Sequence, residues 1–394
     1  MKTPYFVISE EKLNENIDAF KDALQKYWKN SNIAYSIKTN SLPWLLEYIK
    51  EKGVLADAVS EEEYQLAKIC GHEGFRIVYN GPIKTRESLE VAFNEGAIIN
   101  VDSKKDIEYI KENKPSIIGN LGIRLNIPPN IFKTEDIGYV EDGFRFGYSD
   151  VSGDFPKVIE ELSSIYGHRN FGLHLHCNSI TRSIDVYKSI TKYASEIIQK
   201  YNLNPPFIDV GGGFFGGVEG KPTPDNYISI ITETLENVVD KSTTKLIVEP
   251  GSAIIGSVVD LWTSVIDEKD TGYAKIITTD GSRIHIDPLW KKANYLFTTK
   301  TNSDELCNKK QIICGYTCMD HDRIMVLENY PSFTIGDQII YKRVGAYSMT
   351  FGGPFIRYFP DVYIEVKGEL TKVRNRFNTE TYYKIHTSDG RDLK

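Results

Sequence analysis

The chain has 394 residues, enough for two domains with their own cores. Hydrophobic residues make up 41% and charged residues 26%, as in ordinary soluble globular proteins. The net charge of −7 argues against a nucleic-acid partner, and no apolar run is long enough to span a membrane. Five irregularly spaced cysteines argue against a disulfide framework or a metal site, and the N-terminus is unlike a secretory signal. We therefore expect a cytoplasmic protein without a metal.

Residues 5–9 have the character of a short strand. A helix follows, in which Leu13, Ile17, Phe20 and Leu24 form one apolar face. From residue 33 onwards, short strand-like runs alternate with segments long enough for helices. The eight strand-like runs are Ile33–Lys38, Leu55–Ser60, Arg76–Asn80, Ala97–Asp102, Leu121–Asn126, Gly172–Cys177, Phe207–Gly211 and Lys245–Glu249. The segments between them include helices predicted at Glu61–Cys70, Arg86–Asn94, Lys104–Lys111, Ile184–Tyr201 and Asn226–Val239.

Eight strand–helix units in series predict an α/β fold of the (β/α)8 TIM-barrel type. An open doubly wound sheet is the alternative, and it is disfavoured because no G-x-G-x-x-G fingerprint opens the first unit. The connection over residues 127–170 is longer than the others. Its polar first half, which contains proline and glycine, predicts a mobile loop.

After Gly251 the pattern changes to short strands separated by turns, which predicts a second, all-β domain of the barrel or sandwich type. We expect the N-terminal strand to join this domain. The barrel is predicted to span residues 28–253, and residues 1–27 plus 254–394 are predicted to form the β-rich domain. The expected C-terminal strands are Ala274–Thr279, Gln311–Cys314, Asp337–Lys342, Asp361–Val366 and Thr381–His386.

Functional groups of a barrel gather at the C-terminal ends of its strands. The residues at these ends form a chemically diverse set that is typical of a binding site. They are Lys38, Ser60, Asn80, Asp102, Arg124, His176, Gly211–Gly213 and Glu249.

Three consecutive glycines, Gly211–Gly213, follow the seventh strand. They allow the backbone to approach an anion closely, and a barrel's usual phosphate site follows strands seven and eight. The alternative is a tight turn that requires positive φ angles. If the phosphate belongs to pyridoxal 5'-phosphate, Glu249 could keep the ring nitrogen protonated and Lys38 could form the Schiff base. His176 could then lie flat on the ring, although a lone histidine is often only a core residue.

Several short motifs occur in a fixed order along nearly the whole chain. They are Tyr35-Ser36-Ile37-Lys38-Thr39-Asn40, Asp57-Ala58-Val59-Ser60 with Glu63, Arg145-Phe146-Gly147, His176-Cys177-Asn178-Ser179, the triglycine, Glu249-Pro250-Gly251, Cys314-Gly315-Tyr316-Thr317-Cys318 with Asp322, and Gly345-Ala346-Tyr347. In this order they resemble the fold-type III pyridoxal-phosphate decarboxylases, the family of ornithine, arginine and diaminopimelate decarboxylases. The barrel of this family is similar to that of alanine racemase.

The resemblance implies that the protein is an amino-acid decarboxylase. Lys38 would hold the cofactor, His176 would stack on it, and Cys318 would protonate the carbanion in the site of a neighbouring subunit. The family acts as a homodimer with its active sites at the interface. Contacts to the cofactor are implied for Asp57, Ser179, Gly211, Gly212, Gly213, Glu249, Gly251, Ser252 and Tyr347.

Four departures from the family motifs bear on the substrate. Ser252 and Asp287 stand where arginines are usual, Met319 replaces an acid, and Asn178 replaces a glycine. The loss of two cationic anchors argues against diaminopimelate, because its second carboxylate would lack a partner.

Asp280 and Phe355 match residues of the ornithine-type enzymes. We therefore expect a substrate with a distal amine, such as ornithine or lysine, and a place in polyamine biosynthesis. The expected substrate contacts are Asp280, Asp287, Met319 and Phe355.

Three alternatives remain. The substrate could be a specialised or carrier-linked amino acid, because Ser252 and Met319 leave room. An amino-acid racemase is disfavoured by Glu249, since racemases tend to pair the ring nitrogen with arginine. A non-catalytic homologue is disfavoured because Lys38 and Cys318 are both present.

Overall fold

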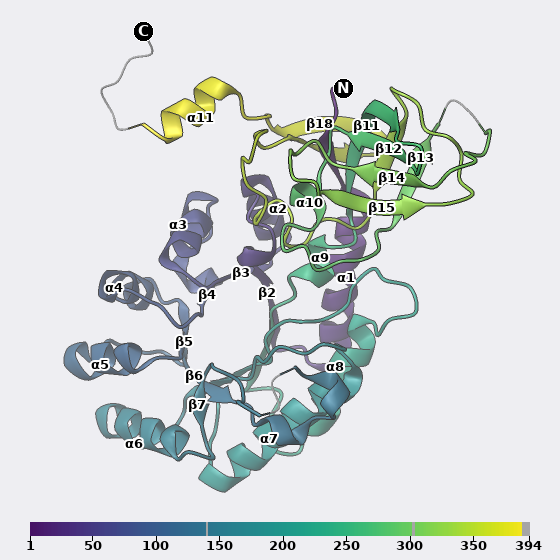
Figure 1. Cartoon of the computed structure of the whole chain (residues 1–394). Coiled ribbons are helices and arrows are strands. Elements are labelled where there is room, and N and C mark those ends of the chain that lie inside the picture. Colours follow the sequence, from purple (N-terminus) through teal and green to yellow (C-terminus); the bar gives the residue numbers. More distant parts are fainter. Residues whose placement is uncertain (139–140, 302–303, 388–394) are drawn as a thin grey trace. The chain divides into compact units, whose positions relative to one another are not determined.

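The computed structural model describes residues 1–138, 141–301 and 304–387 (Figure 1). These residues form two compact units, one of residues 15–254 and the other of residues 1–14 and 255–394. The predicted domain limits, residues 28–253 for the barrel and residues 1–27 plus 254–394 for the β-rich domain, stay a prediction. Within the described residues, no helix combines the length and apolar character that crossing a membrane requires.

Eight parallel strands in the described part of the chain close into a barrel, which confirms the predicted fold and excludes the open sheet. Their order is β5-β4-β3-β2-β10-β9-β8-β6, and the pairing of β5 with β6 closes the ring. The strands are β2 (Ser31–Ser36), β3 (Leu55–Ala58), β4 (Ile77–Tyr79), β5 (Ile98–Val101), β6 (Leu121–Asn126), β8 (Gly172–His174), β9 (Phe207–Asp209) and β10 (Lys245–Val248).

Helices cover the outside of this ring (Figure 1). Many begin at a residue that accepts a hydrogen bond from the first turn, such as Ser103 before α5 and Thr223 before α8. The cap at Thr223 starts α8 two residues earlier than predicted. The helices are α1 (Glu10–Tyr27), α2 (Pro43–Glu51), α3 (Glu61–Ile69), α4 (Arg86–Asn94), α5 (Lys104–Asn113), α6 (Asp154–Tyr166), α7 (Ile184–Tyr201), α8 (Pro224–Leu235) and α9 (Ser252–Ile255).

An apolar cluster from six strands fills one level of the barrel. Phe207 is its largest member, and its ring occupies the space beside Gly122 and Gly172, where a Cβ atom would lie within 2.7 Å and 2.3 Å of it. Because apolar residues fill this level, the polar side chains described below are confined to the C-terminal ends of the strands. The cluster consists of Ala34, Leu55, Val78, Ile98, Phe207 and Ile247.

The long connection over residues 127–170 contains regular structure. Two 3-10 turns, η3 (Pro129–Ile131) and η4 (Thr134–Asp136), precede a short strand β7 (Tyr148–Ser149) that pairs with β6. Its second half forms α6, which is the fifth barrel helix. The predicted mobile loop includes residues 139 and 140, which lie outside the described residues.

The other unit is built on a mixed sheet with the order β15-β14-β12-β11-β1-β17-β18, to which β16 and β13 are joined beside β11. The N-terminal strand β1 lies between β11, to which it is antiparallel, and β17, to which it is parallel, as expected. The strands are β1 (Tyr5–Ser9), β11 (Val259–Asp270), β12 (Lys275–Thr279), β13 (Phe297–Lys300), β14 (Gln311–Cys314), β15 (Arg323–Leu327), β16 (Gln338–Tyr341), β17 (Asp361–Val366) and β18 (Glu369–Arg374). A short helix, α10 (Arg283–Ile286), follows β12.

One expected strand is wrong. Residues 381–385 belong to a helix, α11 (Thr379–Ile385), and His386 is its C-cap. The side chain of Asn378 accepts a hydrogen bond from the N–H of Thr381, and Lys384 forms an i,i+4 ion pair with Glu380. The cap on the first turn and this ion pair therefore favour a helix over the strand that the sequence predicted.

Candidate active site

Lys38 lies in a 3-10 turn, η1 (Ile37–Thr39), directly after β2 and not on the strand itself. Its Nζ atom is 3.8 Å from Oδ2 of Asp57. The carboxylate is fully buried, whereas the lysine side chain remains 40% exposed. Asp57 therefore orients the amine while leaving it accessible to a ligand.

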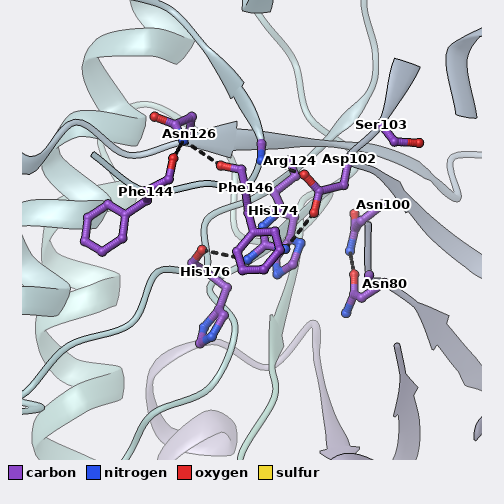
Figure 2. A network of polar contacts seen from close by, with 12 residues as sticks. Asn80, Asn100, Asp102, Ser103, Arg124, Asn126, Phe144, Phe146, His174 and His176 are labelled. Atoms are coloured by element: carbon purple, nitrogen blue, oxygen red, sulfur yellow. Dashed lines mark hydrogen bonds and ion pairs between the residues drawn. The ribbon is translucent and has the colours of Figure 1, made fainter. Parts of the chain in front are cut away.

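Two asparagines connect the carboxylates at this end of the barrel. Asn80 donates to Oδ1 of Asp57 at 2.7 Å and to Oε1 of Glu249 at 2.5 Å. Asn100 donates to Oδ1 of Asn80 at 2.8 Å (Figure 2). It also donates to Oδ2 of Asp209 at 3.3 Å. This amide ladder holds three buried carboxyl groups close together.

Like charges cannot all persist in such a cluster. Polar atoms of His174, Asp209 and Glu249 lie within 4.8 Å of one another, and all three residues are buried. Burial, and then the charge of Glu249, raise the pKa of Asp209 well above its usual range. Burial lowers the pKa of the His174 ring well below its usual range, so that ring is neutral. The raised pKa of Asp209 means that its carboxyl group keeps its proton above the usual aspartate range.

The ring of His176 is fixed in a flat orientation. Its Nδ1 accepts a hydrogen bond from the N–H of Gly212 at 3.2 Å, and its plane is within 10° of the plane of His174. Arg124 donates to the carbonyl of His176 at 3.1 Å (Figure 2). Burial, with the charges of Arg124 and Lys38, lowers the pKa of His176 to about 3. The ring is thus a neutral plane.

Arg124 itself is anchored by a buried ion pair with Asp102, at 2.7 Å between Nη1 and Oδ2. The ring of Phe146 covers its guanidinium group, at 4.5 Å from the ring centre. Asn126, at the end of β6, donates to the carbonyls of Phe144 and Phe146 and so ties this segment to the barrel (Figure 2). A cavity of about 500 Å³ is lined by Arg124, Gly143, Phe144, Arg145, Phe146, His176, Cys177 and Asn178.

Each glycine of the triglycine has a steric reason. A Cβ atom on Gly211 would lie 2.5 Å from His176, and one on Gly212 would lie 2.3 Å from the carbonyl oxygen of Glu249. Gly213 has a φ of +94°, which favours glycine. The three glycines therefore form a tight turn. This turn is compatible with anion binding, because the N–H of Gly213 has no hydrogen-bond partner among the described residues.

Two serines that were expected to bind the phosphate both contact the same arginine, Arg182. The Oγ of Ser179 accepts from the backbone N–H of Arg182 at 2.8 Å, and the Oγ of Ser252 accepts from its Nη1 at 3.1 Å. Gly251, beside Ser252, packs so closely that a Cβ atom would lie 2.0 Å from Thr39. Sequence reasoning missed Arg182, because its side chain reaches Ser252 from a loop that is distant in sequence.

Other expected site residues belong to the unit that contains the mixed sheet. Cys318 lies on the turn after β14, and its thiol is exposed. Asp322 shapes this turn by accepting hydrogen bonds from the hydroxyls of Thr317 at 2.7 Å and Ser282 at 2.8 Å. Met319 is partly buried. The larger side chains of Tyr347 and Phe355 are partly exposed.

The carboxylates of Asp280 and Asp287 are engaged within that same unit. Asp280 accepts from the N–H of Ser264 at 2.8 Å. Asp287 accepts from Arg283 and from the hydroxyl of Tyr295, both at 2.9 Å. Both carboxylates therefore have structural partners, and their contact with a substrate stays a prediction.

A family model described as "Pyridoxal-dependent decarboxylase, pyridoxal binding domain" matches residues 10–256, well over half of the chain. The chain belongs to the pyridoxal-dependent decarboxylases. This decarboxylase is an amino-acid carboxy-lyase that uses pyridoxal 5'-phosphate, as the sequence motifs predicted. The site fits that cofactor, since Oδ2 of Asp57 and both ring nitrogens of His174 are buried without a hydrogen-bond partner among the described residues.

Relatives of this decarboxylase carry a common name. A probable diaminopimelate decarboxylase of Oryza sativa is 25% identical and aligns with 98% of this chain and 79% of its own length. The diaminopimelate decarboxylase of Aquifex aeolicus is 27% identical over 90% of this chain and 84% of its own. The crystal structure of the Helicobacter pylori diaminopimelate decarboxylase complexed with L-lysine has a TM-score of 0.81 at 21% identity, covering 98% of this chain and 97% of that one.

These relatives correct one sequence-based prediction. The expectation of a distal-amine substrate that excludes diaminopimelate is wrong, and the place in polyamine biosynthesis falls with it. The exclusion assumed that no cation is available near positions 252 and 287. In fact Arg182 contacts Ser252, whereas Arg283 is already paired with Asp287. The loss of arginine at position 252 therefore does not remove the positive charge from its surroundings.

Proposed function

We propose that this decarboxylase acts on diaminopimelate, releasing CO2 and forming lysine. This proposal rests on the names of the relatives: those that align with at least 90% of the chain are diaminopimelate decarboxylases. The neighbouring structures from Helicobacter pylori and Methanocaldococcus jannaschii are described as complexes with L-lysine, which is diaminopimelate without one carboxylate. Lysine thus fits as the product.

We propose the following roles for residues of the barrel. Lys38 binds the cofactor covalently, and Asp57 orients its amine. His176 packs its neutral ring on the cofactor, while Glu249 holds the proton of the ring nitrogen. When bound, the cofactor accepts the electrons of the bond that breaks. The phosphate is held by Ser179, Gly211, Gly212, Gly213, Gly251, Ser252 and Tyr347.

We propose further that the protein is a homodimer in which Cys318 of one subunit donates a proton in the site of the other. The exposed thiol supports this, because a proton donor that acts across an interface must be accessible on its own subunit. Met319 and Phe355 would contact the substrate there. Few, irregularly spaced cysteines support a cytoplasmic location.

The substrate proposal is tested by the release of CO2. Incubation with diaminopimelate is expected to give a kcat/KM at least about 100-fold higher than with ornithine or arginine, because an anion site left without its carboxylate partner is costly. Chromatography should show lysine as the other product. Faster release from ornithine or arginine would refute diaminopimelate as the substrate.

The shared site is tested by mixing two inactive variants, Lys38→Ala and Cys318→Ala. After exchange of subunits, the mixture should regain about a quarter of the wild-type rate, because half of the dimers carry one intact site out of two. Light scattering measures the dimer. If the mixed sample stays as inactive as each variant alone while exchange is complete, Lys38 and Cys318 act on the same subunit.

A further inference from the structure

Arg182 is a partly buried arginine without a counter-ion. It lies in the loop between β8 and α7, and within the described part of the chain no carboxylate is within ion-pair distance of its guanidinium group. Nη1 donates to Ser252, and the guanidinium carbon is 5.4 Å from the centre of the Phe215 ring. Charges withdrawn from water are normally paired, so this group is suited to an anion that binds from outside the chain.

The backbone of Arg182 is held in one conformation. Its φ angle of 52° lies in the left-handed region, which is costly for a residue with a side chain. Its N–H donates to Ser179. The carboxylate of Asp136 accepts hydrogen bonds from the hydroxyls of the two flanking residues, Thr181 and Ser183. Several contacts thus maintain a strained conformation that directs this side chain to Ser252.

The surroundings of the guanidinium group are those of an oxyanion site. The hydroxyls of Ser179 and Ser252 and the N–H of Gly213 belong to the loops that meet there, and all can donate to a phosphate oxygen. The guanidinium group adds a charged, forked donor, whose only hydrogen bond within the described residues is the one to Ser252.

We propose that Arg182 is the cationic contact of the cofactor's phosphate and does the work of the arginine that the resembled family carries at position 252. The charge thus reaches the phosphate from the loop after β8. This inference rests on the proposed location of the phosphate at the glycine loop.

The test compares two ligands that differ only in the phosphate. Apo-protein is titrated with pyridoxal 5'-phosphate and with pyridoxal, and binding is followed by the absorbance of the lysine-bound cofactor. Arg182→Gln should weaken binding of the phosphorylated form by about 10- to 100-fold, the usual effect of losing a charge-assisted hydrogen bond. Binding of pyridoxal should change less than about twofold. Arg182→Lys, which keeps the charge and loses the fork, should lie between.

A second variant separates this role from a structural one. Ser252→Arg in the Arg182→Gln background should restore most of the lost affinity, because Nη1 of Arg182 and the side chain at position 252 already meet. Equal weakening for both ligands would show a structural role and overturn the proposal. An unchanged affinity for the cofactor with a raised KM for the amino acid would assign Arg182 to the substrate carboxylate and overturn it as well.

Ser179→Ala distinguishes failure of this inference from failure of the underlying location. If Ser179→Ala selectively weakens binding of the phosphorylated ligand and Arg182→Gln does not, the phosphate lies at the glycine loop and Arg182 is not its contact. If neither variant distinguishes the two ligands, the phosphate is bound elsewhere, and both proposals are wrong.

Discussion

Replacing Lys38 with alanine is expected to abolish the visible absorbance that pyridoxal 5'-phosphate acquires on binding and to lower the decarboxylation rate at least about 10³-fold. The amine is the group that bonds covalently to the cofactor's aldehyde, and it lies 3.8 Å from the buried carboxylate of Asp57. An alanine removes both the nucleophile and the charge that opposes the raised pKa of Asp57. Absorbance spectra and CO2 release measure the two effects.

Lys38→Arg is the matched control for charge. It keeps a cation beside Asp57 but cannot replace the amine as a nucleophile, so it should be as inactive as Lys38→Ala while unfolding closer to the wild-type temperature. A Lys38→Ala protein that keeps the visible band would mean that another amine attaches the cofactor.

The barrel could be predicted because its strands are short apolar runs separated by well-capped helices. Arg86–Asn94 and Ile184–Tyr201 were predicted with their observed limits, since Thr85 and Ser183 cap them. The strand ends were less accurate: β2 stops at Ser36, and Lys38 lies in a 3-10 turn. The mixed sheet was predicted only in part: β11, β13, β15 and β18 were missed. Of these, β11 and β13 pair with strands distant in sequence, whereas β15 and β18 pair with the strand just before them in the chain.

The site was predictable where a chemical group ends a strand and less so elsewhere. Reading the strand ends identified Lys38, Asn80 and Glu249, which the structure connects through hydrogen bonds and an ion pair to Asp57. It missed Asn100 and Asp209, which lie within strands that appear only apolar. It also missed Arg182, because the reach of a side chain between two loops leaves no regular spacing in the sequence.

The carboxyl pair at the end of β9 and β10 gives the site its main electrostatic property. Asp209 accepts from the N–H of Gly211 at 2.9 Å and is fully buried beside Glu249. Its raised pKa means that the folded apo-protein holds a proton that the unfolded chain releases as the pH rises above the usual aspartate range. The stability of the apo-protein should therefore fall with rising pH, from that range up to the pKa of the folded state.

Glu249→Gln is expected to lower kcat by about 10² to 10³, because an amide cannot hold the proton on the ring nitrogen against the charge that develops in the reaction. In the same variant, the melting temperature of the apo-protein should fall less between pH 4 and neutral pH than it does in the wild type. Removing the charge of Glu249 lowers the pKa of Asp209 and narrows the range in which stability is lost. Melting temperatures of the apo-protein at both pH values measure this effect independently of catalysis.

Asp209→Asn is the control for this pair. It removes the carboxyl group that carries the proton and keeps Glu249, and its amide oxygen can still accept from the N–H of Gly211. We expect a much smaller loss of kcat than in Glu249→Gln and a melting temperature less dependent on pH. If Asp209→Asn is as inactive as Glu249→Gln, the negative charge belongs to Asp209, and the partner of the ring nitrogen has been assigned to the wrong carboxylate.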